Sequence, residues 1–371
     1  MSRWRWRGNI ALLGVALAFT LFPLLPNDDV IDSDWPAFAT GARLIVSDPS
    51  HLYDLNVQKR VESDVTGGRV LVTLGISGIL PFLAPAWVAL LAVPFEAFGT
   101  NIGGRLWILF GLASLGAGLY LAIRPRSPTE ILPGFAAVPT ALMMLNAQLD
   151  GVVALGLGAA IALWSRPFLA GLALGLTLMK PQLVLPLGVA LILARKWRVI
   201  AGWATAGAAL LVPTLLLSPN WVFEWLGQTR STVQTGSREI DLAHFAVALP
   251  SSLQGPALAV ITAIAIAGVL VLAWVRRDQL QASAAIIIAG GIVAAPHALP
   301  ADLVLVAFAL VVWGRARWYE WLGLSIGALI AALAAPPVPA VVGVALVAWV
   351  CLRASGVLTS KPPGPVLASA R

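Results

Sequence analysis

The sequence contains very little charge for its length. Of its 371 residues, 11% are charged and 59% are hydrophobic, and its mean hydropathy is +0.88. A soluble domain typically has about a quarter of its residues charged, because charged groups cover its surface. The scarcity of charge excludes a soluble globular enzyme and a disordered chain. It indicates a polytopic integral membrane protein.

Cysteine is almost absent as well, since Cys351 is the only one. A single cysteine excludes an intramolecular disulfide and a cysteine-based metal cluster. The net charge of +7 does not indicate a nucleic-acid partner. The basic residues lie in short clusters between apolar runs, as expected where Lys and Arg remain cytoplasmic. The arginine- and alanine-rich composition is typical of a GC-rich bacterial genome, so we expect a bacterial plasma membrane.

Long apolar runs dominate the chain. A spanning helix needs about 20 apolar residues. The first run follows three arginines without a small-residue cleavage site after it, which indicates an uncleaved first transmembrane helix. Two long polar stretches, 27–77 and 218–256, separate the other runs and are expected to be extracytoplasmic loops. The apolar runs are 10–26, 78–98, 104–123, 131–147, 150–165, 167–179, 181–194, 199–217, 257–275, 281–295, 299–313, 318–335 and 337–353.

The positive-inside rule predicts the topology. With the N-terminus inside, Glu96, Arg105 and Arg124 are all expected on the inner side. One apolar run separates Arg105 from Arg124, so we expect one segment to be re-entrant or a half-span. The fold class predicted is all-α, with about twelve transmembrane helices and both termini cytoplasmic. Residues 1–355 form one transmembrane domain, and 356–371 form a flexible cytoplasmic tail.

Polar residues at the ends of apolar runs converge on the outer face in this topology. They include the Asn146–Asp150 segment, Lys180, His297 and Asp302. Ionisable residues at membrane depth are costly and usually functional. Such a group could use a carboxylate as a general base toward a sugar hydroxyl. Its cations could hold the phosphate of a lipid-linked donor.

The first polar loop carries an amphipathic segment at about residues 34–46. Pro36 suits the first turn of a helix. We expect this helix to lie in the membrane interface, with Trp35 and Phe38 toward lipid. Asp34 would then precede the helix near the outer membrane surface.

These residues resemble the GT-C glycosyltransferases, specifically glycosyltransferase family 87, over about residues 32–310. Two positions depart from the family pattern: Ala84 replaces a proline, and Ala147 replaces a glycine. The motifs that carry the resemblance are Asp34-Trp35-Pro36 with Arg43, Asp48-Pro49 and Leu52-Tyr53-Asp54; Phe82-Leu83-Ala84-Pro85 with Pro94; Arg105-Leu106-Trp107; Ala147-Gln148 with Asp150; Gly171, Gly175 and Lys180-Pro181 before Arg195-Lys196-Trp197-Arg198; and Ala295-Pro296-His297 with Asp302-Leu303.

The resemblance implies an inverting enzyme with a GT-C-like fold. It would transfer a hexose, mannose by family precedent, from a polyprenyl monophosphate to a glycolipid or lipoglycan of the cell envelope. Asp34 would be the general base at the extracytoplasmic face. We assign the donor phosphate to Lys180, His297 and Arg43. Contacts to sugar or other substrate groups are assigned to Gln148, Asp150, Trp35 and Asp302, with Asp302 alternatively orienting His297.

No cofactor or metal site is expected. Asp32-Ser33-Asp34 mimics the Asp-x-Asp motif of metal-dependent enzymes, but a monophosphate donor has no diphosphate to neutralise. The implied partners are the lipid-linked donor, the glycolipid acceptor and the bilayer, and a monomer is expected. The acceptor, the linkage and the role of 218–256 are not assigned.

Two other functions are open to the sequence. A membrane transporter or lipid flippase predicts inverted repeats and polar residues near mid-membrane, whereas no repeat is obvious. A scaffold protein gives no reason for Lys180 and His297 on the outer side. Gly151, Gly156 and Gly158 lie in an apolar run without a preceding strand, so close helix packing is expected there rather than a phosphate loop.

Overall fold

The computed structural model describes residues 24, 30–69, 71–73, 76–78, 80–124, 130–231, 239–246 and 249–358. Within these residues the chain is helical apart from one small hairpin, in agreement with the all-α prediction. In the hairpin Leu71 pairs with Gly78 in antiparallel register. The N-terminal elements are α3 (Trp35–Ser47), η2 (Pro49–His51), α4 (Leu55–Thr66), β1 (Leu71–Thr73), β2 (Ile76–Gly78), α5 (Ala86–Glu96) and α6 (Thr100–Ile123).

The rest of the chain forms a bundle of helices, several of which begin or end in a short 3₁₀ turn. Its elements are α7 (Leu132–Ala136), α8 (Val138–Leu145), α9 (Asp150–Ala162), α10 (Pro167–Leu174), η4 (Gly175–Met179), η5 (Pro181–Val184), α11 (Leu185–Leu193), α12 (Trp197–Leu217), α13 (Trp221–Ser231), η6 (Leu242–Ala246), α14 (Ser251–Val275), α15 (Leu280–Ala294), η7 (Pro300–Leu303), α16 (Val304–Trp313), α17 (Trp318–Leu333) and α18 (Val338–Ser355).

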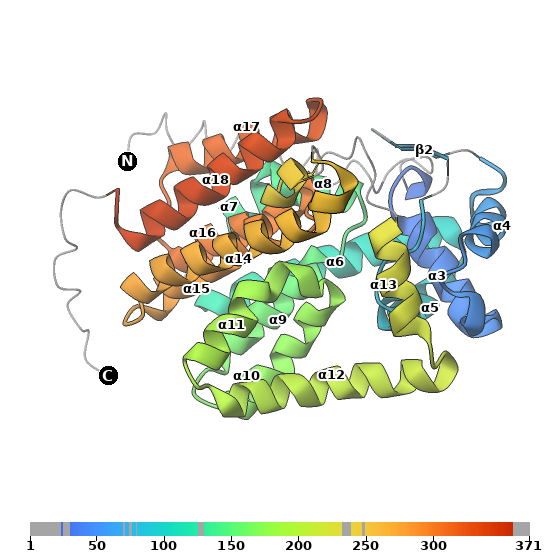
Figure 1. The fold of residues 1–371 in the computed structure, drawn as a ribbon, viewed down its shortest axis with the longest axis horizontal. Coiled ribbons are helices and arrows are strands. Elements are labelled where there is room, and N and C mark those ends of the chain that lie inside the picture. Colours follow the sequence, from blue (N-terminus) through green and yellow to red (C-terminus); the bar gives the residue numbers. More distant parts are fainter. Residues whose placement is uncertain are drawn as a thin grey trace.

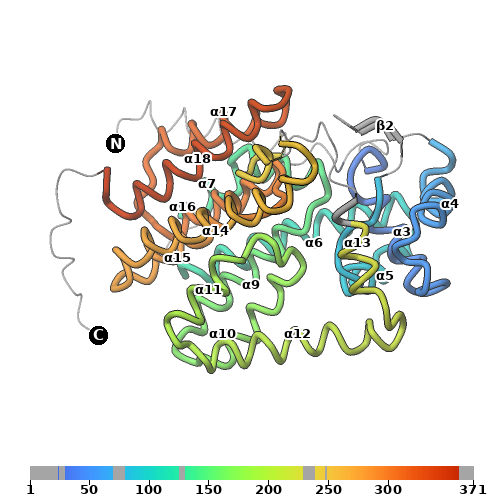
Figure 2. The backbone as a smooth tube through the Cα atoms, viewed as in Figure 1, coloured from blue at the N-terminus to red at the C-terminus, as the bar shows by residue number. Residues whose placement is uncertain are grey.

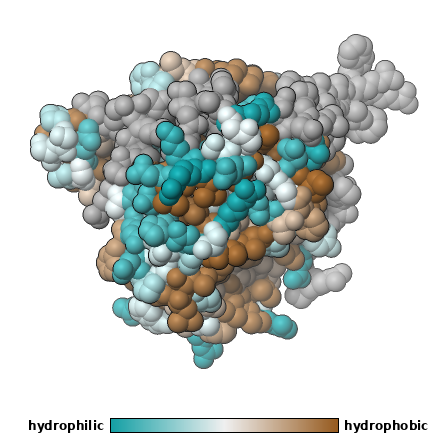
Figure 3. All heavy atoms as spheres, turned by 90° about the vertical axis from the view of Figure 1, so that its right-hand side faces the viewer, coloured by the Kyte–Doolittle hydropathy of each residue, from teal (hydrophilic) through white to brown (hydrophobic). Residues whose placement is uncertain are grey.

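The bundle and the loop helices occupy different ends of the molecule. Helices α3, α4, α5 and α13 gather at the right-hand end of Figure 1, and α14 to α18 form the upper left part. The backbone tube in Figure 2 shows α12 running along the lower edge from α10 toward α13. Seen from that right-hand end, the surface mixes hydrophilic and hydrophobic residues (Figure 3).

Four of the described helices are long and apolar enough to cross a membrane: α6, α12, α14 and α18. The other predicted runs between 131 and 335 form shorter apolar helices or pairs of short helices. The run 131–147, for example, breaks at Ala137 into α7 and α8. Helices able to span a membrane are therefore present, but the count of twelve is not confirmed. Most of the predicted first span, and the tail from 359, lie outside the described residues.

Two contacts correct the predicted placement of the chain around residue 100. Arg43 of α3 forms a 2.7 Å ion pair with Glu96 at the end of α5. The Trp35 indole donates a 2.7 Å hydrogen bond to the Thr100 carbonyl at the start of α6. Glu96 and the beginning of α6 therefore lie beside the first polar loop, and their predicted placement on the opposite face is wrong. The run 78–98 supplies only the 11-residue α5, which is too short to cross a membrane.

Helix α3 has the predicted start, with Asp34 immediately before it and Pro36 in its first turn. Its predicted lipid contact is wrong. Trp35 and Phe38 are buried and both pack against Trp107 of α6. An apolar face can cover lipid or protein equally well, and here it covers α6. Helix α3 is consequently fixed inside the protein rather than lying on the membrane surface.

The glycine-rich stretch of α9 packs closely on α6, as expected. A Cβ atom at Gly151 would lie 1.9 Å from the Gly111 carbonyl oxygen, and one at Gly158 would lie 2.0 Å from that of Gly118. The two glycine pairs have the same seven-residue spacing, which brings the two backbones together along two turns. Small residues permit this approach between membrane helices.

We expect Gly151→Val to disrupt folding, because its side chain would collide with backbone atoms that have no alternative rotamer. Overpacking in a tight interface costs about 1–3 kcal/mol or more. Gly268→Val in α14 is the matched control, since a Cβ atom there meets nothing within 4 Å. Size-exclusion chromatography after heating in detergent should show early loss of the Gly151 variant. Equal thermal stability of the two variants would contradict this packing.

Candidate active site

Asp34 is held at the junction of the first loop and the bundle. Its backbone N–H donates to the Asn146 carbonyl at 3.3 Å. The Gln148 side-chain amide donates a hydrogen bond to the Asp34 carboxylate. A loop residue is thereby joined to a turn more than a hundred positions later in the chain. The predicted proximity of Asp34 and Gln148 is confirmed.

The turn that carries Gln148 is shaped by an unusual backbone conformation. Ala147 has φ +50°, a left-handed region that favours glycine. The Trp107 indole donates to its carbonyl at 2.9 Å. Helix α9 begins at Asp150, so the turn places both Gln148 and Asp150 at the N-terminal end of this helix. The departure from the family's glycine at Ala147 therefore falls at a position where glycine would be favoured.

Lys180 lies between two carboxylates. Its Nζ is 2.9 Å from Asp150 Oδ2 and 2.5 Å from Asp302 Oδ1. The Lys180 side chain is 13% exposed, that of Asp150 is fully buried, and that of Asp302 is 5% exposed. The chain is irregular at this point because Pro181 disfavours helical geometry at the preceding residue, and Lys180 separates η4 from η5. We call Asp150, Lys180 and Asp302 the ion triad.

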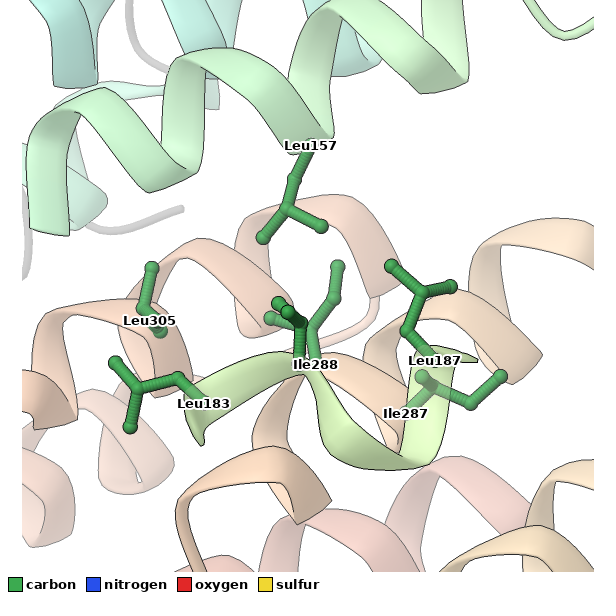
Figure 4. Close-up of a pocket in the computed structure, with 7 residues that line it drawn as sticks. Leu157, Leu183, Leu187, Ile287, Ile288 and Leu305 are labelled. Carbon is green, nitrogen blue, oxygen red and sulfur yellow. The ribbon is translucent and has the colours of Figure 1, made fainter. Parts of the chain in front are cut away.

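A small apolar pocket is lined in part by residues that follow Lys180 and Asp302 in the sequence (Figure 4). Leu183 follows Lys180 by three residues, and Leu305 follows Asp302 by three. Only leucine, isoleucine and valine side chains line the pocket, from α9, η5, α11, α15 and α16: Leu157, Leu183, Val184, Leu187, Ile287, Ile288 and Leu305. The triad side chains are themselves largely buried, and an unpaired buried charge is costly.

The electrostatic surroundings of Asp34 suit a general base. Burial raises the pKa of Asp34 to about 7, opposed by the positive charge of Lys180 and reinforced by the negative charge of Asp302. His297 also acts on Asp34 and favours its charged form. A carboxylate with a pKa near neutrality can accept a proton from a hydroxyl far better than an ordinary aspartate.

His297 occupies the loop between α15 and η7, and its side chain is 51% exposed. Its Nδ1 is 3.0 Å from Glu239 Oε1. The neighbouring Ala298 N–H donates to Asp241 Oδ2 at 2.6 Å, and Ala298 in turn accepts from the Ile240 N–H at 2.9 Å. The second polar stretch therefore contributes directly to the surroundings of His297.

The structure brings together Asp34, Gln148 and the ion triad, with His297 close enough to act on Asp34. Two predicted residues are not part of this group. Arg43 lies about 13 Å along α3 from Asp34 at 1.5 Å per residue and is paired with Glu96. The Trp35 ring is fully buried against α6.

The expectation that Asp302 orients His297 is also wrong. One Asp302 oxygen accepts from Lys180 and the other accepts from the Leu299 N–H at 2.6 Å. Glu239 holds His297 instead. Glu239 and Asp241 lie in the polar stretch 218–256. Nothing in their local sequence connects them with the His297 loop, which is almost 60 residues away.

Several of the quoted motifs have clear structural roles. The Asp54 side chain accepts from the Asn56 and Val57 N–H groups and caps α4. The Tyr53 hydroxyl donates to the Ala84 carbonyl at 2.8 Å. Gln58 bonds the backbone of Phe82 through both its amide atoms. The segment 52–58 thereby fixes the chain that leads into α5.

No group of three histidine, cysteine or acidic side chains is arranged to hold a metal ion among the described residues. Metal-free catalysis stays a prediction.

Comparison with known proteins identifies the family of this chain. The family model for glycosyltransferase family 87 matches residues 82–300. The match contains Gln148, Asp150, Lys180, Glu239 and His297, whereas Asp34 and Asp302 lie outside it. No curated protein and no solved structure gives a significant match. Because the match covers more than half of a chain with membrane-spanning helices, the chain belongs to glycosyltransferase family 87 and is a membrane glycosyltransferase.

Proposed function

We propose that this enzyme transfers a hexose, with mannose as the first sugar to test, from a polyprenyl monophosphate to a glycolipid or lipoglycan acceptor. Asp34 removes the proton from the acceptor hydroxyl. The hydroxyl oxygen attacks the anomeric carbon from the face opposite the phosphate, and the bond between that carbon and the phosphate oxygen breaks. The products are an inverted glycoside and a polyprenyl phosphate.

The observation that carries this proposal is the surroundings of Asp34. Gln148 donates to its carboxylate, and burial raises its pKa to about 7. A base needs a pKa near the operating pH, which most loop carboxylates lack. Family membership does not favour the transporter or flippase alternative.

A group that binds the donor phosphate needs positive charge that is not already neutralised by carboxylates. Lys180 is already paired with two carboxylates, so the ion triad carries no surplus positive charge. We therefore place sugar hydroxyls near Gln148 and the ion triad. His297, with its half-exposed side chain, is the group that we place against the donor phosphate.

We also propose a topology of twelve spans with both termini cytoplasmic and the site extracytoplasmic. Helix α5 is too short to cross, so α6 begins on the side of the first loop and carries the chain inward. The remaining runs then alternate, and Arg166, Arg195, Arg276, Arg315 and Arg353 all fall inside. This arrangement removes the conflict between Arg105 and Arg124 and follows the positive-inside rule. We place the enzyme in a bacterial plasma membrane.

A transfer assay tests the proposal. Purified protein in nanodiscs is incubated with radiolabelled polyprenyl-phosphate-mannose and a membrane lipid extract, with and without EDTA. A new labelled glycolipid supports the donor class, and its formation in EDTA supports metal-free transfer. If donor binds without product, the acceptor is wrong. If no donor binds, the proposed donor class is wrong.

The pH dependence of the reaction should follow Asp34. The ionised form is the active base, so kcat/KM should rise as pH increases through about 7 and fall below it. In Gln148→Leu the carboxylate loses a hydrogen bond worth about 1.5–3 kcal/mol, which corresponds to an upward shift of about one to two pH units. Initial rates between pH 5 and 9 measure both profiles. A flat wild-type profile between pH 6 and 8 would rule out this role for Asp34.

A further inference from the structure

The second polar stretch is anchored against the bundle at Ile240. This side chain is fully buried, and Gly343 of α18 lies directly against it, since a Cβ atom at Gly343 would be 2.4 Å from the Ile240 carbonyl oxygen. The Ile240 N–H also donates to the Ala298 carbonyl. Residues 239–241 are therefore held in a fixed position beside residues 297 and 298.

The two carboxylates of this segment, Glu239 and Asp241, contact different partners. Glu239 contacts the His297 ring at 3.0 Å, and Asp241 accepts from the Ala298 and His244 N–H groups at 2.6 and 3.1 Å. The Asp241 contacts fix the backbone beside His297. The Glu239 contact fixes the ring itself.

The two side chains of the Glu239–His297 contact differ in their exposure to solvent. Glu239 has a 6% exposed side chain, whereas the side chain of His297 is 51% exposed. Only Nδ1 of His297 is engaged by Glu239. Within the part of the chain that the structure describes, no partner is found for Nε2. When one ring nitrogen donates to a carboxylate, the other is fixed in direction and in its protonation role.

We propose that Glu239 is a positioning residue that orients His297 through Nδ1 and keeps it cationic, so that Nε2–H faces the phosphate of the lipid-linked donor. This inference rests on the proposed function and adds a residue to which no role has been assigned. Glu239 does not touch substrate in this scheme; it acts through His297.

The groups around His297 favour the cation. Desolvation lowers its pKa, but the hydrogen bond and charge of Glu239, with the charges of Asp241 and Asp302, raise it above the usual value. Asp34 lies within electrostatic reach of the ring, and His244 lies 3.9 Å from the second Glu239 oxygen. An imidazolium held by a buried carboxylate offers a charge-assisted hydrogen bond to an anion.

The chain suits a direct test because it has only three histidines, His51, His244 and His297. NMR titration of ring-labelled histidine in nanodiscs can follow each ring separately, with His297→Gln assigning its signal. Farnesyl monophosphate serves as the probe, because it has the phosphate and an isoprenoid tail but no sugar. The variants are Glu239→Gln, Glu239→Asp and the control Asp48→Asn, whose carboxylate lies 2.8 Å from the exposed His51.

In Glu239→Gln we expect the midpoint for His297 to fall by about one pH unit and farnesyl phosphate binding at pH 7 to weaken about tenfold. Glu239→Asp should recover part of both, and Asp48→Asn should change only the His51 titration. In a His297→Gln background, Glu239→Gln should cause no further loss of binding. With a full sugar donor the loss should fall on KM more than on kcat.

An unchanged His297 midpoint or unchanged phosphate binding in Glu239→Gln would overturn the inference, as would a wild type that binds no farnesyl phosphate. The results distinguish a failure of this inference from a failure of the proposed function. If Glu239 controls phosphate binding but no sugar is transferred, the inference stands and the sugar assignment is wrong. If sugar is transferred equally well without Glu239, the proposed function stands and the inference is wrong.

Discussion

Asp34→Asn is expected to lower kcat by about 10²–10⁴-fold, the usual contribution of a positioned general base. Asparagine keeps the size of the side chain and its place beside Gln148, but it cannot accept the proton of an acceptor hydroxyl. The fold should survive, because the backbone contacts of Asp34 with Asn146 and Phe38 do not involve the carboxylate. The measurement is single-turnover transfer from labelled donor with saturating acceptor.

Asp32→Asn is the matched control. Asp32 lies two residues earlier in the same loop and is likewise neither fully buried nor fully exposed. It should keep wild-type activity if Asp34 alone is the base. If both variants lose activity and added divalent metal changes the rate, the Asp-x-Asp interpretation gains support. Wild-type activity in Asp34→Asn would remove the base assignment outright.

The ends of apolar runs were the most informative part of the sequence. Gln148, Asp150, Lys180 and Asp302 each stand at or near the end of an apolar run, and the structure brings them together with Asp34 of the first polar loop. Polar groups are costly at membrane depth, so their positions are constrained before any pairing is known. Hydropathy changes sharply at such points, and α6, α12 and α14 end where the predicted runs 104–123, 199–217 and 257–275 end.

Pairings across the chain could not be predicted in this way. Lys180 meets Asp150 and Asp302 across 30 and 122 residues, and Glu239 meets His297 across 58. Hydropathy also does not tell protein from lipid, which is why Trp35 was wrongly placed. Charge clusters misplaced Glu96 relative to the first loop, because they do not reveal that it pairs with Arg43 of that loop.

Lys180→Met is expected to destabilise the protein by about 3–5 kcal/mol, because removing one partner of a buried ion pair leaves uncompensated charge. Asp150 and Asp302 would remain buried with no cation between them. Unfolding in mixed detergent micelles measures the loss. Lys196→Met is the control, since Lys196 is exposed and its Nζ lies over the Trp164 ring, 5.9 Å from the centroid.

The triple variant Lys180→Met, Asp150→Asn and Asp302→Asn separates the two roles that Lys180 could have. If Lys180 neutralises carboxylates, removing all three charges should recover most of the stability, because no charge is left unpaired. If Lys180 instead serves mainly as a phosphate ligand, Lys180→Met should raise the KM for the donor while the protein unfolds at the wild-type detergent concentration. The short contacts on both sides of Nζ favour the first result, since a lysine already held by two carboxylates has little charge left for a third anion.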